Sequence, residues 1–227
     1  MSVEGVRRAR APRGSGDRLR DEILDAATEL LLETGHARAV SIRSVAQRVG
    51  VTPPSIYLHF ADKDALMDAV CARYFEKLDV EMQRVAAQHT DPVEVLRAQG
   101  LAYVRFATQS PELYRIATMG EWRSGSNVDT ALDSSAFKHM RASAQKLMDD
   151  GIYPPDDPTT VALELWSAAH GVAAMLIAKP HLPFGDPGAF ADRVLRSVFC
   201  GRVVIGHSGR DATHPKSWRH ESEETRI

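Results

Sequence analysis

The amino-acid sequence predicts an all-α protein with about nine helices. Along most of the chain, apolar residues recur at spacings of three and four, which is the period of a helix that buries one face. The alternation of apolar and polar residues that is typical of a β-strand is almost absent. The chain has 227 residues, 44% of them hydrophobic and 26% charged, so it can bury one large core or two modest ones.

The first two predicted helices are bounded by capping residues. Residues 17–34 carry an apolar face, and Gly35 follows them where a left-handed residue commonly ends a helix. A shorter helix is expected to begin after Ser41, whose hydroxyl can accept a hydrogen bond from a free backbone N–H, and to stop at Gly50.

The segment GVTPPSIYLHF, residues 50–60, predicts a third helix after a tight turn. A residue before proline is disfavoured in the helical conformation, so Thr52 suits the N-cap. Pro53 suits the first helical position, where its missing N–H has no partner to lose. Two short helices joined in this way predict a helix-turn-helix. We expect the N-terminus of the third helix, with its exposed N–H groups, to face DNA phosphate.

The side chains of this third helix divide into two sets. Ile56 should face inward and hold the element on the first helix. Ser55, Tyr57 and His59 face elsewhere, and their hydroxyl, phenol and imidazole groups suit contacts with phosphates and base edges. The alternative for Tyr57 and His59 is that their rings pack against the first helix.

A long helix is predicted from the Asp62-Lys63-Asp64 cluster to about residue 88, long enough to join two domains. Further helices are expected near 93–108, 111–119, 129–150, 158–179 and 187–206. The predicted organisation is a flexible Arg-rich arm at 1–16, a helix-turn-helix domain at 17–63, a helical ligand-binding and dimerisation domain at 64–206, and a disordered tail at 207–227.

Charge is unevenly distributed along the chain. The net charge of −2 does not by itself indicate a nucleic-acid partner, but residues 1–20 contain six arginines against Glu4 and Asp17. This segment is either a solvated tail or an arm that follows DNA phosphates or the minor groove beside the helix-turn-helix.

Two stretches resemble the TetR family of transcriptional regulators. They are SIRSVAQRVGV at residues 41–51 and SIYLHFADK at residues 55–63, and the similarity extends from about residue 17 to 72. The segment WSAAHG at residues 166–171 is similar to a Trp-x-x-x-His-Gly signature of one subgroup. The resemblance implies an all-helical homodimer whose N-terminal domains bind operator DNA and whose C-terminal domains receive a small ligand.

The same resemblance implies which residues contact DNA. They are Ser41, Arg43, Thr52, Pro53, Ser55, Tyr57, His59 and Lys63. Position 53 often carries a polar base-reading residue in the family, whereas Pro53 offers only van der Waals contact, for example to a thymine methyl group. Base recognition is therefore expected to depend more on Arg43 and Ser55.

Aromatic, methionine and histidine side chains of the C-terminal region form the candidate ligand site. They are Tyr103, Phe106, Met119, Trp122, Phe137, Met140, Trp166 and His170. The alternative, which is the more common one for any single residue of this kind, is that they are ordinary core residues, because helical periodicity cannot distinguish a filled core from a hollow one. The expected ligand, if one exists, is small and apolar or amphipathic.

The last two predicted helices carry long apolar faces. Val161, Leu165 and Val172 lie on the apolar face of the helix at 158–179, and Leu195 and Val198 lie on the apolar face of the helix at 187–206. We expect more apolar surface than one small domain can bury, and hence a homodimer that pairs these helices across a two-fold axis. Two recognition helices would then meet half-sites about 34 to 36 Å apart in a pseudo-palindromic operator.

Two other classes of function compete with a regulator. An enzyme could use His170 near Glu164, but no nucleophile elbow, phosphate loop or metal pair supports catalysis, so neither an enzyme nor a cofactor or metal is expected. A helical protein-interaction module is the other alternative, and salt-dependent DNA binding would distinguish it.

Compartment and cysteine usage add two further expectations. Cys71 and Cys200 are expected to be buried thiols without a disulfide. No apolar run approaches the roughly 20 residues of a membrane span, and no signal peptide is evident, so a cytoplasmic protein without a membrane partner is predicted.

Overall fold

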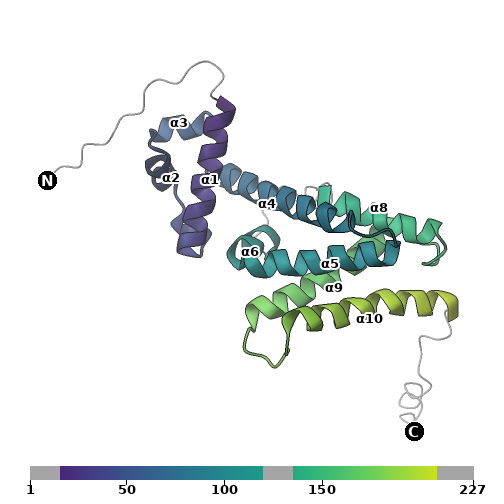
Figure 1. Cartoon of the computed structure of the whole chain (residues 1–227). Helices are drawn as coiled ribbons and strands as arrows, with labels where there is room; N and C mark the ends of the chain where they lie inside the picture. The colour runs from purple at the N-terminus through teal and green to yellow at the C-terminus, as the bar shows by residue number, and fades with distance from the viewer. Residues whose placement is uncertain (1–15, 120–134, 209–227) are drawn as a thin grey trace, which may run out of the picture. The chain divides into compact units, whose positions relative to one another are not determined.

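The computed structural model describes residues 16–119 and 135–208, and the regular structure within these ranges is helical (Figure 1). Nine α-helices and one 3-10 turn occur there, so the all-α prediction is confirmed. They are α1 (Gly16–Thr34), η1 (Ala37–Ala39), α2 (Ile42–Val49), α3 (Pro53–Tyr57), α4 (Lys63–Ala86), α5 (Pro92–Gln109), α6 (Pro111–Met119), α8 (Ser135–Asp149), α9 (Pro158–Ala178) and α10 (Pro187–Ser208).

The predicted helices agree with these bounds to within a few residues. Parts of two predictions concern residues outside the described ranges. The start of the helix expected at 129–150 falls partly outside the described residues. The Arg-rich arm at 1–16 and the tail at 207–227 fall almost entirely outside them.

The chain divides into two compact units, each made from two segments. The first unit is Met1–Glu81 with Phe106–Ala136, and the second is Met82–Arg105 with Phe137–Ile227. The boundaries fall inside α4, α5 and α8, so no unstructured linker marks them. The division at residue 63 expected from the sequence remains a prediction about function.

The first unit has an apolar core that fixes the helix-turn-helix. Ile23 and Leu31 of α1, Val45 of α2 and Ile56 of α3 are 0% exposed, which confirms the inward orientation predicted for Ile56. Residues of α6 pack against the same cluster. Burying side chains of this size stabilises each by roughly 1.5 to 3 kcal/mol, so the short α3 is held by packing more than by its own helical propensity.

The turn between α2 and α3 requires a glycine. Gly50 has φ 77°, in the left-handed region, and its N–H donates to the carbonyl oxygens of Ala46 and Gln47. At the other end of α2, Ser41 and Ser44 form a reciprocal capping box, in which each side chain accepts a hydrogen bond from the other residue's backbone N–H. Both predicted boundaries of α2 are confirmed.

The second unit contains α9 and α10, which lie side by side (Figure 1). Val161, Leu165 and Val172 of α9 are at most 4% exposed, and so is Leu195 of α10. The expectation that a single chain could not bury these faces is therefore wrong for these four residues, whereas Val198 of α10 is half-buried. The prediction underestimated how many helices of the same chain pack against these faces. Sequence periodicity does not say how many helices surround a given face.

Helix α9 also corrects the expectation about apolar runs. By length and composition alone this helix could cross a membrane, with a mean hydropathy of 1.6 over its most apolar window. Core helices of folded domains pass the same test, and the buried residues of α9 belong to the core of the second unit. We therefore interpret α9 as a core helix.

The two cysteines differ from each other. Cys71 is half-buried, and burial raises the pKa of its thiol to about 12. Cys200 is exposed on α10, so its predicted burial is wrong. Both are free thiols.

Candidate functional site

The start of α3 offers fewer hydrogen-bond donors than expected. Pro53 and Pro54 have no N–H, and the N–H of Ser55 donates to the Thr52 carbonyl oxygen at 2.9 Å. The expectation that exposed N–H groups of this helix face phosphate is therefore wrong. Thr52 occupies the N-cap as predicted, but its side chain makes no capping bond and its Oγ1 lies 3.1 Å from Ser55 Oγ.

The exposed surface of α3 is largely apolar. Pro53 and Pro54 are exposed, Tyr57 is 53% exposed and Leu58 is 83% exposed. Leu58 was missed at the sequence level, although it follows the buried Ile56 by two positions and so lies about 200° around a helix from it. His59 and Ser55 are half-buried.

Three predicted DNA-contact residues lie outside α3. Arg43 is exposed on the first turn of α2. The hydroxyl of Ser41 takes part in the capping box with Ser44. Lys63 Nζ donates to the Ala37 carbonyl oxygen at 2.7 Å, so in this conformation its ammonium holds the start of α4 to η1. Lys63 therefore has a structural role that its position in the motif did not reveal.

An ion-pair cluster connects α2 to α1. Arg48 donates to Glu33 with both terminal nitrogens, at 2.9 and 2.6 Å, and to Glu29 at 3.3 Å. The hydrogen bond from Arg48 lowers the pKa of the Glu33 carboxyl. Arg48 thus serves the fold of the helix-turn-helix, in contrast with the exposed Arg43.

The second unit encloses a small cavity of about 20 Å³. Its lining comes from α4, α5, α8, α9 and α10: Met82, Leu96, Gln99, Gly100, Tyr103, Met140, Leu165, Trp166, Ala169 and Phe199. No charged side chain belongs to this lining. A cavity of this volume holds about one water molecule, whereas small-molecule sites measure roughly 300 to 1,000 Å³. A ligand would therefore have to open it.

A chain of hydrogen bonds runs along one side of this cavity. Trp166 Nε1 donates to the Tyr103 hydroxyl oxygen at 3.0 Å, and that oxygen lies 3.3 Å from His170 Nδ1. An indole N–H only donates, so the tyrosine oxygen accepts from Trp166, and the direction of the Tyr103–His170 hydrogen bond follows the imidazole tautomer. Burial lowers the pKa of His170, in agreement with a neutral ring.

The remaining predicted ligand residues are distributed unequally. Phe137 contacts Trp166 with ring centroids 6.3 Å apart, and Met140 lines the cavity. Phe106 instead packs on Tyr74 in the first unit, with centroids 4.9 Å apart. The side chain of Met119 and the whole of Trp122 lie outside the described residues.

Gln99 is a cavity residue that the sequence analysis missed. It is only 3% exposed, and its Oε1 accepts a hydrogen bond from Ser143 Oγ at 3.1 Å. A buried amide within an apolar helical face is a signal that could have identified it, because burying an unpaired polar group is costly.

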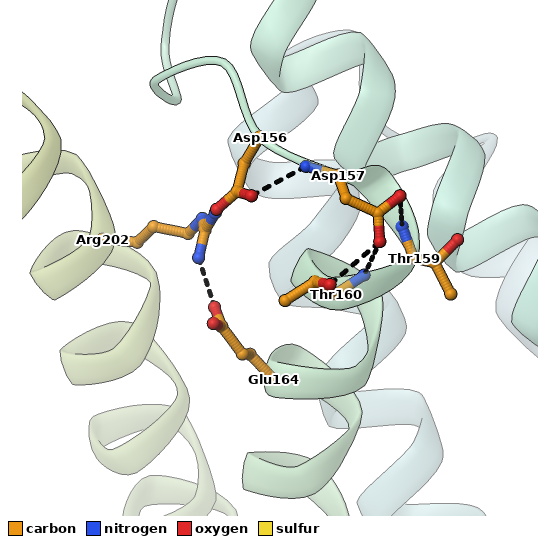
Figure 2. A network of polar contacts seen from close by, with 6 residues as sticks. All are labelled: Asp156, Asp157, Thr159, Thr160, Glu164 and Arg202. Atoms are coloured by element: carbon orange, nitrogen blue, oxygen red, sulfur yellow. Dashed lines mark hydrogen bonds and ion pairs between the residues drawn. The ribbon is translucent and has the colours of Figure 1, made fainter.

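A polar network at the start of α9 uses Glu164 for another purpose than catalysis. Figure 2 shows Arg202 reaching both Glu164 and Asp156, with its terminal nitrogen 2.6 Å from the Asp156 carboxylate. Asp157 accepts hydrogen bonds from the N–H groups of Thr159 and Thr160 and caps the helix (Figure 2). Glu164 is therefore paired with Arg202, while His170 is bonded to Tyr103, which does not favour the acid–base pair considered above.

These features define a helical protein with a helix-turn-helix in one unit and an aromatic cavity in the other. Residues 23–70 match the model described as bacterial regulatory proteins of the tetR family, and residues 96–198 match the tetracyclin repressor-like C-terminal domain. The chain belongs to the tetR family.

Individual relatives are distant. The transcriptional activator FasR of Mycolicibacterium smegmatis is 33% identical over 100 residues, covering 44% of this chain and 45% of FasR. The class D tetracycline repressor protein of Escherichia coli is 31% identical over 134 residues, covering 58% of this chain and 55% of the repressor. The chain thus spans about half the length of these curated relatives.

Solved structures agree on the fold over a larger part of the chain. A Rhodococcus sp. RHA1 protein of unknown function superposes with a TM-score of 0.71 at 22% identity, covering 82% of this chain and 95% of that one.

Proposed function

We propose that this protein is a transcriptional regulator that acts as a repressor. It binds a pseudo-palindromic operator as a homodimer and leaves the DNA when a small ligand enters the second unit. The observation that carries the proposal is the α2–α3 arrangement, in which the buried Ile56 anchors a short helix whose remaining surface, including Tyr57, is exposed.

The proposed DNA contacts fall into two groups. Arg43 is the proposed phosphate anchor, because it is exposed and, among the described residues, has no ion pair. Thr52, Pro53, Ser55, Tyr57 and His59 form the proposed base-facing and sugar-facing surface. Ser41 and Lys63 are proposed to contribute backbone positioning, since their side chains support helix ends.

DNA binding is tested by footprinting the purified protein on DNA upstream of its own gene, followed by titrations at several salt concentrations. Arg43→Ala should lower the slope of log affinity against log salt by about one unit, as expected for one lost phosphate contact. Arg196→Ala, at an exposed arginine on α10 of the second unit, provides a matched control that should leave the slope unchanged. A protein with no salt-dependent binding would favour the interaction-module alternative.

The proposed dimer surface is the exposed row of α9. Leu163, Ser167, Gly171 and Met175 repeat every four residues; Leu163 is 37% and Met175 44% exposed, and the space next to the Cα of Gly171 is open. This row replaces the buried Val172 as the place to test dimerisation.

The dimer is tested by sedimentation and operator binding of Met175→Glu. A charge on this face should give a monomer at micromolar concentration and weaken operator binding with it, because an ion would be buried without a partner. Ala142→Glu on the exposed side of α8 is the matched control and should remain dimeric. A monomeric wild-type protein with full operator affinity would refute the homodimer.

Ligand response is proposed for the cavity unit. Ala169 lines the cavity, so Ala169→Leu should fill it. The variant should keep operator binding and lose release by any small molecule that releases the wild-type protein. A variant that responds normally would place the ligand site elsewhere.

A further inference from the structure

The exposed face of α3 is hydrophobic where a base-reading surface would be expected to carry donors and acceptors. Four exposed residues form this apolar surface: Pro53, Pro54 and Tyr57 of α3, and Leu58, which directly follows the helix as its C-cap. The hydroxyls of Thr52 and Ser55 are directed to each other at 3.1 Å. Of the polar side chains in α3, Ser55 already has a local partner, which leaves the Tyr57 hydroxyl for polar readout.

We propose that the apolar surface of α3 recognises the 5-methyl groups of thymines in the major groove, with Leu58 as its specificity-determining residue. This inference rests on the proposed DNA-binding function and adds a chemical feature of the operator. Among the four bases, only thymine presents an apolar group on its major-groove edge. An exposed leucine can gain from contact with that methyl but cannot satisfy the donors and acceptors of other base edges.

The occupant of this surface follows from its surroundings. The surface lies within residues 23–70, which match the tetR-family N-terminal model, and the exposed Arg43 of α2 supplies a cation for a neighbouring phosphate. Leu58 is the most exposed of the large hydrophobic residues in the described ranges, at 83%, and it directly follows the 53% exposed Tyr57. A packing role within the chain would have left these side chains covered.

Recognition of a methyl group in the major groove should extend to 5-methylcytosine. A 5-methylcytosine carries its methyl at the same place in the major groove as thymine, although its other base-edge groups differ. Replacing thymine by 5-methylcytosine should therefore preserve the contact with Leu58, whereas replacing it by unmodified cytosine should not. Methylation of cytosine in such a site would strengthen binding.

The experiment uses the full chain and an operator selected from random duplexes. Each thymine is replaced in turn by deoxyuridine, which removes only the methyl group and keeps all base-edge hydrogen bonds. At the thymines contacted by α3, affinity should fall about fourfold per methyl, the ratio expected from burial of one methyl-sized group. The 5-methylcytosine duplex should bind more tightly than the cytosine duplex at the same positions.

Leu58→Ala then assigns the contact to one residue. The variant should bind the thymine operator more weakly than the wild type does, but it should no longer distinguish thymine from deoxyuridine at one position in each half-site. Val80→Ala is the matched control, because Val80 is 69% exposed on α4 outside the apolar surface of α3. It should leave both affinity and deoxyuridine sensitivity unchanged.

The outcomes separate this inference from the function on which it rests. If no duplex is selected, the proposed DNA-binding function fails. If an operator is selected but deoxyuridine is tolerated at every thymine, the methyl inference is overturned and DNA binding stands. If deoxyuridine weakens binding equally for wild type and Leu58→Ala, methyl recognition belongs to another residue and the role of Leu58 is overturned.

Discussion

The two cores of this protein are built differently. The core around the helix-turn-helix consists of apolar side chains such as Ile23, Leu31 and Ile56, all 0% exposed. The core of the second unit includes the buried Gln99 and the hydrogen-bonded Tyr103, and it leaves a cavity of about 20 Å³. The first arrangement favours one rigid geometry, whereas the second contains polar groups and space that a ligand could use.

This difference indicates which of the two cores can change its packing. The helix proposed to read DNA, α3, has five residues and cannot support itself, so its position depends on a filled core. The ligand response proposed for the second core requires a second arrangement of similar free energy, and the small cavity and the hydrogen bonds of Tyr103 are features from which such an arrangement could form.

The largest effect on the free energy of unfolding is expected from creating a cavity in the filled core of the first unit. Ile56→Ala should lower the free energy of unfolding by about 2 to 5 kcal/mol, because it removes a fully buried side chain from α3. Denaturant unfolding measures this change. Leu58→Ala, at a position 83% exposed, is the control and should change stability by at most about 0.5 kcal/mol. Equal effects of the two variants would contradict the anchoring role of Ile56.

Removing a hydrogen-bonding hydroxyl from the core of the second unit should have an intermediate effect on the free energy of unfolding. Tyr103→Phe removes the hydroxyl that accepts from Trp166 and bonds His170, and it should cost about 1 to 3 kcal/mol because both partners are partly buried. A double-mutant cycle with Trp166→Phe should show coupling between the two sites. Additive effects would mean that this core behaves like the apolar one.

Helix caps in the two units should differ in their response to acid. Ser41→Ala should destabilise α2 by about 1 kcal/mol, equally at neutral and acidic pH, because a hydroxyl does not titrate there. Asp157→Asn in α9 tests a charged cap. Backbone N–H donation from Thr160 lowers the pKa of Asp157 below its usual value of 3.8.

The charged Asp157 cap should make the stability of the folded state depend on pH. A lowered carboxyl pKa stabilises the folded state above pH 3.8, and this stabilisation is lost as pH falls through the folded value. The difference between wild type and Asp157→Asn in thermal unfolding should therefore shrink toward pH 3, while the Ser41→Ala difference stays constant. A constant difference for both variants would contradict the ionised cap.

The smallest expected effect is the titration of His170. Its pKa is lowered by burial, so the folded protein resists a proton that the unfolded chain accepts near pH 6.5. Stability should be complete above pH 6.5 and should fall as the pH decreases below it. His170→Gln should remove this part of the pH dependence in thermal unfolding between pH 5 and 8. A pH profile identical to that of the wild type would assign the titration to other histidines.

The sequence by itself determined the local features of this protein. Helical periodicity, the Ser41 cap, the Gly50 turn and the placement of Pro53 were all predictable, because each depends on residues within one or two helical turns. The inward orientation of Ile56 was predictable for the same reason.

Only the tertiary structure decided the features that depend on distant contacts. Lys63 bonds a carbonyl 26 positions away, and Tyr103 meets His170 across 67 positions, so neither pairing leaves a periodic signal. Whether Val172 faces a partner or its own core depends on how many helices surround it, and the volume of a cavity depends on the sum of many side-chain positions. Periodicity reports which face of a helix is apolar, while packing decides what covers that face.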